Sequence, residues 1–203
     1  MMFAILNSST STLIKDKSRF IAVTFHVRNG EEVKRCLSAI KKEYPKARHY
    51  CYAYIIGAEE KGFDDGEPAR TAGRPLLELL KRGQFDETLI AVVRYFGGTL
   101  LGASRLLRAY VAVANEALSG AEKHEIVHLF SYALELAYSD YEYLLSEAKK
   151  RSYILEKSVF SDTIMIKLLA REPADDFLWQ TLHGRGKITP LEMERRYLKE
   201  TST

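Results

Sequence analysis

The sequence lacks several features that mark specialised classes of protein. It has only two cysteines, Cys36 and Cys51, among 203 residues, and they form no CxxC pair. Two thiols cannot build a disulfide framework or a zinc knuckle, so we expect a reduced, cytoplasmic setting. No apolar run approaches the roughly 18 residues that a membrane span needs. Residues 1–9 have neither the basic start nor the long apolar run of a signal peptide, so neither export nor membrane insertion is expected.

Charge of one sign does not dominate either. The formal net charge is +3, with +4 on residues 1–122 and −1 on residues 123–203. Nucleic-acid-binding domains usually carry a strongly basic face, so any such role here needs local clustering of arginine and lysine. The apolar share of 46% and the charged share of 28% are ordinary for a globular protein with a core.

The first half of the chain has the patterns of an α+β domain. Residues 18–27 alternate β-branched, aromatic and other side chains in a way that is typical of a strand. Val33, Leu37 and Ile40 recur at helical spacing before Pro45, which cannot continue a helix. We expect strands at 18–27, 50–57 and 88–96, helices at 31–44, 75–82 and 104–122, and a polar loop at 59–73.

Two of these helices follow conspicuous glycine- and arginine-rich segments. Pro75 is expected at the first position of its helix and Gly83 just past its end. In the helix at 104–122, Arg105 and Arg108 are three residues apart and are expected to lie together on the outer face. The residues expected to face the core from that helix are Leu107, Tyr110, Val111, Ala114 and Leu118.

The second half has a different order of elements. Strands are expected at 132–138, 153–160, 163–170 and 188–197, and helices at 141–151 and 173–183, with a hairpin turn about Ser161 and Asp162. This β-α-β-β-α-β order is that of the ferredoxin-like split. The boundary falls near 122–130, and we predict two domains, residues 1–125 and residues 126–203.

The strongest functional signal lies in residues 63–75 and 93–105, each of which runs into an expected helix start. Helix N-termini bind anions through unpaired N–H groups, and glycines let a ligand approach the backbone. Arginine adds forked donors suited to phosphate. We therefore predict a phosphate-binding site between the two segments, formed by Asp65, Glu67, Arg70, Thr71, Gly73, Arg74, Arg94, Tyr95, Gly97, Gly98, Gly102, Arg105 and Arg108.

A purely architectural interpretation of the same residues stays open. The glycines would then only permit tight turns, and the acids would only pair with arginines. Arg94 lies inside an apolar run, where an unpaired charge is very costly, so we expect it to pair with Asp65 or Glu67. Alternatively, Asp64, Asp65 and Glu67 would hold Mg²⁺ together with a phosphate ligand. No other cofactor is indicated.

The same residues resemble a known family. DDGEPARTAGRPLLELL, from Asp64, and VRYFGGTLLGASRLLRAY, from Val93, are similar to the paired signatures of the Impact/YigZ family. The resemblance extends over essentially the whole chain. It implies a ribosomal-protein-S5-domain-2-like first domain and a ferredoxin-like second domain similar to the last domain of elongation factor G. The family pattern has small residues at the positions of Ala69 and Arg70, lysine at Leu100, and two glycines at Ser104 and Arg105.

The resemblance also implies a function. Both fold relatives handle RNA or the ribosome, and eukaryotic Impact proteins regulate translation. A cytosolic RNA- or ribosome-associated regulator is therefore expected, with no catalytic residue to carry over from the family. The alternative is an enzyme or binding protein for a phosphorylated small molecule or nucleotide, although no P-loop is present. The sequence does not indicate an oligomeric state.

Two further patterns carry competing interpretations. Residues 124–128 read HEIVH, the HExxH pattern of zinc proteases, but they fall at the expected junction of a helix and a strand, which favours a chance match. Tyr50, Tyr52 and Tyr54 alternate on one strand face, where they would either stack bases or, as we expect, pack in the core. Both cysteines are expected to be inert thiols.

Overall fold

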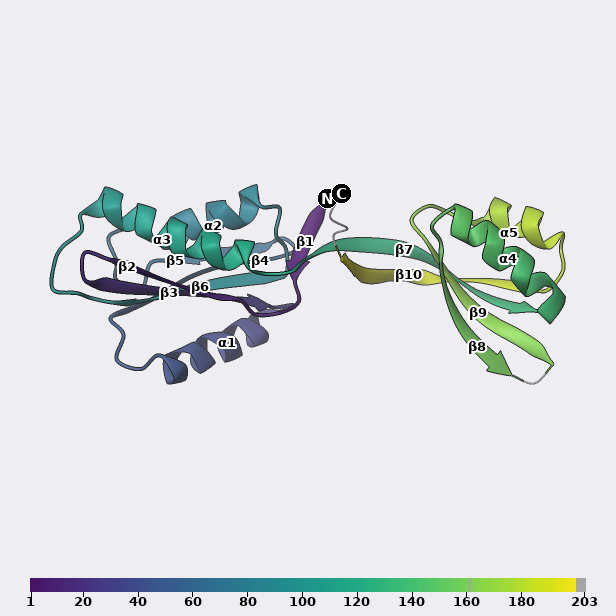
Figure 1. Cartoon of the computed structure of the whole chain (residues 1–203), viewed down its shortest axis with the longest axis horizontal. Helices are drawn as coiled ribbons and strands as arrows, with labels where there is room; N and C mark the ends of the chain where they lie inside the picture. Colours follow the sequence, from purple (N-terminus) through teal and green to yellow (C-terminus); the bar gives the residue numbers. More distant parts are fainter. Residues whose placement is uncertain (161, 200–203) are drawn as a thin grey trace. The chain divides into compact units, whose positions relative to one another are not determined.

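The computed structural model describes residues 1–160 and 162–199 (Figure 1). The chain divides into two compact units, Met1–Ile126 with Leu198 and Lys199, and Val127–Tyr197. Each unit combines helices with an antiparallel sheet, so the predicted two-domain α+β fold class is confirmed. No helix in the described part of the chain is long and apolar enough to cross a membrane.

The first unit contains a five-stranded sheet in the order β2-β3-β6-β4-β5, with every neighbouring pair antiparallel. At its centre β6 lies between β3 and β4, and its residues are buried except at the last position. A further short strand, β1 (Met2–Ile5), pairs with the start of β7. The strands of the sheet are β2 (Thr10–Lys15), β3 (Ser18–His26), β4 (His49–Ile56), β5 (Glu59–Phe63) and β6 (Thr88–Tyr95).

Helices cover both faces of this sheet. On one face lies α1 (Gly30–Glu43), and on the other lie α2 (Gly73–Arg82) and α3 (Ala103–Ser119) (Figure 1). The alternation in β3 explains this, because Phe20 packs in the core under α2 and α3 whereas Ile21 packs in the core under α1. The three tyrosines of β4 are associated with the α1 side of the sheet, where Tyr54 is buried.

Several elements of the first unit differ from the expected ones. The expected loop at 59–73 begins with β5, whose five residues are all exposed, so no apolar alternation revealed it. Strands β1 and β2 were not anticipated. Helix α2 begins at Gly73, two residues before Pro75, a shift that the helix tolerates because the first N–H groups need no partner within it.

The core face of α3 is displaced from the expected one. Tyr110, Ala114 and Leu118 are buried as predicted, but Leu107 is 37% exposed and Leu106 takes its place in the core. Val111 is only half-buried. Leu107 and Val111 lie on the side of α3 that borders α2, where they line a groove between the two helices.

The second unit has the element order β7 (Lys123–Leu136), α4 (Tyr138–Lys150), β8 (Ile154–Phe160), β9 (Thr163–Ala170), α5 (Asp175–Leu182) and β10 (Lys187–Lys199). Its strands are ordered β10-β7-β9-β8, which is the strand order of the ferredoxin-like split. Leu134, Leu144, Ile166 and Leu178 join the sheet and both helices in one core. Ser161, in the predicted hairpin turn, lies outside the described residues.

Candidate functional site

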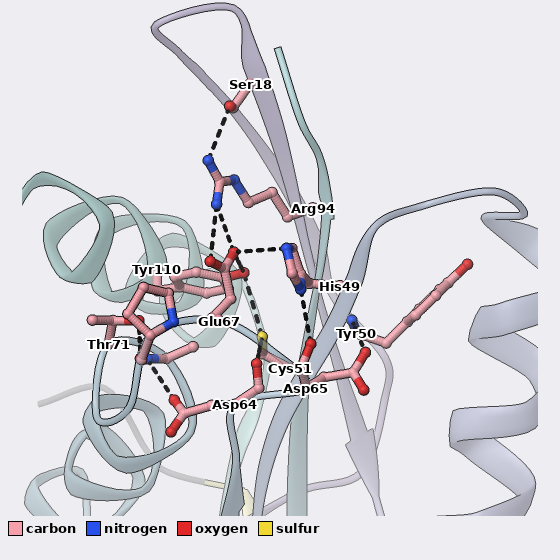
Figure 2. Close-up of polar contacts among 12 residues, drawn as sticks. Ser18, His49, Tyr50, Cys51, Asp64, Asp65, Glu67, Thr71, Arg94 and Tyr110 are labelled. Carbon is pink, nitrogen blue, oxygen red and sulfur yellow. Dashed lines mark hydrogen bonds and ion pairs between the residues drawn. The ribbon is translucent and has the colours of Figure 1, made fainter. Parts of the chain in front are cut away.

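A buried ion pair lies at the centre of the candidate site. Arg94, on β6, and Glu67, in the loop of residues 64–72, are 5% and 8% exposed. Nη1 of Arg94 donates to both carboxylate oxygens of Glu67, at 2.7 and 3.0 Å (Figure 2). The predicted pairing of Arg94 is therefore confirmed for Glu67. Asp65 does not take part, because its carboxylate accepts the backbone N–H of Tyr50.

Groups from three further elements surround this pair. The hydroxyl of Tyr110, on α3, donates to Oε1 of Glu67 at 2.7 Å. The hydroxyl of Ser18, on β3, accepts from Nη2 of Arg94 at 3.3 Å. Nε2 of His49, on β4, lies 3.8 Å from Oε1 of Glu67. The pair thus joins the 64–72 loop to β3, β4, β6 and α3.

A neutral layer adjoins the ion pair. The thiol of Cys51 lies 2.9 Å from the carbonyl oxygen of Asp64, to which it donates, and 3.3 Å from the hydroxyl of Tyr110. Burial raises the pKa of the Cys51 thiol and of the Tyr110 hydroxyl well above their ordinary values. Both groups therefore stay protonated, and Cys51 is not an activated nucleophile.

The start of α2 is closed by a carboxylate of the protein itself. Oδ1 of Asp64 accepts the N–H groups of Ala72 and Gly73, at 2.9 and 2.8 Å, and Oδ2 accepts that of Arg70 at 3.0 Å. Asp64 thus occupies the position that an anionic ligand would take at this helix N-terminus. A Cβ on Gly73 would lie 2.3 Å from the backbone nitrogen of Phe63, so this glycine serves close packing. Thr71 is buried and donates to the carbonyl oxygen of Pro68.

The start of α3 differs from that of α2. It follows Gly102, whose φ of 77° suits glycine, and no side chain caps it. Its first turn contains no acidic residue, and residues 102–105 are exposed. This helix therefore presents N–H groups and the positive end of its dipole to solvent. Gly97, upstream, allows close contact with the β2–β3 turn, because a Cβ there would lie 2.0 Å from the carbonyl carbon of Lys17.

A pocket of about 460 Å³ lies between the 64–72 loop and the start of α3. We call it the Arg94 pocket; its lining includes Arg48, Arg94, Phe96, Gly102 and Ala103. Nε of Arg94 has no hydrogen-bond partner within the described part of the chain, although the side chain is buried. The ring centre of Phe96 lies near two guanidinium groups, 5.7 Å from that of Arg48 and 5.6 Å from that of Arg94. The volume suits a ligand of nucleotide size.

A second concave surface lies between α2 and α3. This α2/α3 groove has a volume of about 500 Å³ and is lined by Arg70, Arg74, Pro75, Glu78, Leu79, Arg82, Leu107 and Val111. Arg70 and Arg74, which the sequence placed with Arg94 in one site, line this groove and do not line the Arg94 pocket.

The remaining predicted site residues lie around the pocket without lining it. Tyr95 stacks on Arg19 and donates to the carbonyl oxygen of Pro45. Nε of Arg105 donates to the carbonyl oxygen of Leu101 at 2.9 Å. Arg108 is exposed, as expected, and Gly98 has a φ of 84°. The predicted residues that do line the pocket are Glu67, Arg94 and Gly102.

The pocket residues absent from the predicted site include Arg48, His49 and Phe96, which carry charge or an aromatic ring. Arg48 precedes β4 in a segment with no motif, and only the sheet register brings it near, since His49 is paired with Arg94. Phe96 directly follows Tyr95 at the end of β6 and is 38% exposed. In the sequence, the one sign that Phe96 could belong to a binding site is that an aromatic residue directly follows a buried strand.

Two competing interpretations change with the structure. The HExxH segment lies in β7, where four residues span about 13 Å, so His124 and His128 cannot bind one zinc ion as helical neighbours do. The rings of Tyr52 and Tyr54 lie in the cores on the α1 side of the sheet. A free stacking platform on β4 is therefore absent among the described residues.

The acids proposed for Mg²⁺ do not converge. The carboxylates of Asp64 and Asp65 accept backbone N–H groups, and that of Glu67 is paired with Arg94. No cluster of histidine, cysteine, aspartate and glutamate within residues 1–160 and 162–199 has the arrangement of a metal site. Any Mg²⁺ here would have to arrive with a phosphate ligand rather than bind to a carboxylate cage.

Comparisons with known proteins are consistent over the whole chain. Residues 16–118 match the family described as the Impact N-terminal domain. The chain is 30% identical over 216 residues to the IMPACT family member YvyE of Bacillus subtilis, covering 98% of this chain and 97% of that protein. It is 40% identical over 127 residues to the IMPACT family member YigZ of Escherichia coli, covering 60% and 62%. A crystal structure titled as that of a hypothetical protein aligns with a TM-score of 0.61 at 28% identity, covering 94% and 97%.

Replacing Glu67 by glutamine tests the buried ion pair. We expect Glu67→Gln to lower the free energy of unfolding by about 3 kcal/mol, because it leaves the Arg94 charge buried and uncompensated. Urea unfolding measures this change. The control is Glu60→Gln, which breaks an exposed pair with Lys81 and is expected to cost less than about 1 kcal/mol. Equal effects of the two substitutions would contradict the central role of the pair.

Arg70 provides a test of backbone strain. Its backbone φ is 64°, a value that residues other than glycine rarely adopt. Arg70→Gly should therefore raise the free energy of unfolding by about 0.5–1 kcal/mol, net of the extra freedom of glycine in the unfolded chain. The matched control Arg74→Gly, within α2, should lower it by a similar amount. A destabilised Arg70→Gly variant would show that the Arg70 side chain has a structural role.

The rates at which the two cysteines are alkylated show whether the core of the first unit is folded. Cys36 is half-buried and Cys51 fully buried, and burial raises the pKa of both thiols. At mildly alkaline pH, iodoacetamide should slowly modify only Cys36 in the folded protein and both cysteines in urea. Mass spectrometry of the intact protein counts the adducts. Modification of Cys51 without denaturant at the rate of Cys36 would contradict its burial.

Proposed function

The chain belongs to the Impact family, as its two motifs predict, and we propose that it regulates translation in the cytosol by binding RNA through a phosphate group in the Arg94 pocket. The link to translation rests on the family resemblance. The phosphate-binding chemistry rests on one observation: Arg94, whose buried Nε has no partner among the described residues, lines a pocket that also contains the uncapped start of α3.

The charges in the pocket favour an anion. Glu67 compensates the charge of Arg94, so Arg94 contributes a directional hydrogen bond more than a net charge. The net attraction comes from Arg48, which is exposed and makes no ion pair with a described residue, and from the positive end of α3. Backbone N–H groups and arginine together are the usual donors to nucleic-acid phosphates.

Phe96 favours RNA over a free phosphate ion. Its ring is 38% exposed and lines the pocket, and a base next to the bound phosphate would stack on it. The guanidinium groups of Arg48 and Arg94 lie within 5.7 Å of the ring centre, so the ring and the positive charges are close together. The pocket thus combines a phosphate site and an aromatic ring, as proteins that bind single-stranded nucleic acid do.

A phosphorylated small molecule or nucleotide is the second candidate, because a volume of about 460 Å³ is large enough for such a ligand. A single nucleotide would make the same contacts with Arg94 and Phe96. The two candidates differ in the number of phosphates bound, and therefore in salt dependence.

A salt series with matched arginine variants tests the RNA proposal. Binding of a labelled single-stranded RNA and co-sedimentation with ribosomes are measured from about 50 to 200 mM salt, with and without Mg²⁺. Arg48→Ala should reduce the slope of log K against log salt by about 0.7, the contribution of one phosphate contact on a single strand. The control Arg35→Ala removes the same charge from α1, on the other face of the sheet, and should leave the slope unchanged.

Either of two results would overturn this proposal. Absence of binding to RNA and ribosomes at the lowest salt, with Cys51 still protected from alkylation, would exclude the RNA role. Equal slopes for Arg48→Ala and Arg35→Ala would exclude the pocket as the site. Saturable binding of a nucleoside monophosphate, with no binding to RNA, would instead favour the small-molecule candidate.

A further inference from the structure

The α2/α3 groove has the features of a second binding surface, separate from the Arg94 pocket. Its floor is aliphatic and is formed by Pro75, Leu79, Leu107 and Val111. Leu107 is 37% exposed, although it lies on a helix that packs against both the sheet and α2. An exposed apolar strip between two packed helices is a feature of protein-interaction sites.

The rim of the groove is positively charged. Arg70, Arg74 and Arg82 are all exposed and line the groove, against a single acidic residue, Glu78. No ion pair joins these three arginines to another residue in the described part of the chain. Arg74 and Arg82 lie eight residues apart on α2, which corresponds to about 12 Å along the helix. Two fixed positive charges thus follow the length of the groove.

Arg70 contributes the third charge from a strained position. Its backbone has a φ of 64°, and its N–H is held by the carboxylate of Asp64. The backbone of Arg70 is thus bound, but its side chain makes no ion pair with a described residue, so no ion pair within this part of the chain explains an arginine at a position that suits glycine. Strained residues of this kind concentrate at binding sites.

We propose that the α2/α3 groove binds an acidic amphipathic helix of a partner protein. Leucine-type side chains three and four residues apart on that helix would lie on Leu79 and Leu107, and carboxylates beside them would pair with Arg74 and Arg82. Since α2 has ten residues, a partner helix of about three turns covers the groove.

The composition of the groove favours a peptide over nucleic acid. No aromatic residue lines it, so bases would have no ring on which to stack. The N-terminus of α2 is closed by Asp64, and that of α3 lies at the Arg94 pocket, so no helix end offers N–H groups to a phosphate here. An aliphatic floor with a cationic rim is complementary to an apolar stripe with flanking carboxylates.

Designed peptides and charge reversal test this proposal. The probe is a fluorescein-labelled helical peptide of about 14 residues, with leucines at helical spacing and flanking glutamates, beside a peptide in which lysines replace those glutamates. The wild-type protein should bind the acidic peptide at least about tenfold more tightly than the basic one. The variant Arg74→Glu/Arg82→Glu should reverse this preference. The control Arg28→Glu/Arg35→Glu reverses two charges near α1 and should not.

The stability of each variant is checked by urea unfolding and by the protection of Cys51 from alkylation. Arg70→Gly adds a second readout. It should weaken the binding of the acidic peptide by about threefold, while the free energy of unfolding of the protein increases. A merely structural role of Arg70 would move both quantities in the same direction.

Four outcomes would overturn the proposal. One is a dissociation constant of the acidic peptide above about 1 mM, and another is a preference that Arg74→Glu/Arg82→Glu does not reverse. The third is a loss of RNA binding in this variant as large as in Arg48→Ala, which would make the groove part of the nucleic-acid surface. The fourth is self-association of the wild-type chain that this variant abolishes, which would make a second copy the occupant. Only the third outcome requires RNA binding; the other three can be observed whether or not the Arg94 pocket binds RNA.

Discussion

The first unit depends on one buried charge. Arg94 is buried near the end of β6, the central strand, between Phe20 of β3 and His49 of β4, and an arginine cannot lose its charge to escape burial. The fold therefore has to bring a carboxylate to it, and the carboxylate comes from a loop, not from a strand or helix. Through Glu67 the loop is fixed to β6, and through Tyr110 and Ser18 the same pair fixes α3 and β3. The candidate site is therefore organised by the need to compensate the buried charge of Arg94.

The internal contacts of the acidic residues in the 64–72 loop leave the exposed surface near the loop positively charged. The loop contains three acidic residues, and the protein itself binds all three: Asp64 closes α2, Asp65 binds β4, and Glu67 binds Arg94. The arginines nearby point outward instead. A chain with a formal net charge of only +3 thus has locally basic surfaces beside this loop, because the three acids of the loop bind groups of the protein itself. Overall charge could not indicate this, since it counts a buried acid and an exposed arginine alike.

The sequence predicted the features that short-range patterns determine. Alternation located β3 and β4, an apolar run located β6, and the cost of an unpaired buried charge narrowed the partner of Arg94 to Asp65 or Glu67. It failed where the outcome depends on contacts between distant segments. Strand β5 has no apolar pattern and exists through pairing with β4. The core face of α3 is set by its packing against both the sheet and α2, and Arg48 reaches the pocket only through the sheet register.

The division of the predicted site into two surfaces has the same origin. Arg70 and Arg94 were assigned to one site because both belong to glycine-rich segments that precede a helix. Only two residues separate Glu67 from Arg70, yet Glu67 faces the buried pair and Arg70 the groove, with the Arg70 backbone held at a φ of 64°. The 64–72 loop thus contributes lining residues to both the Arg94 pocket and the α2/α3 groove. Substitutions inside the loop, such as those of Glu67, disturb both surfaces at once, whereas Arg48 and Arg82 each belong to only one. Substitutions of Arg48 and Arg82 therefore separate the roles of the two surfaces more cleanly than a substitution of Glu67 does.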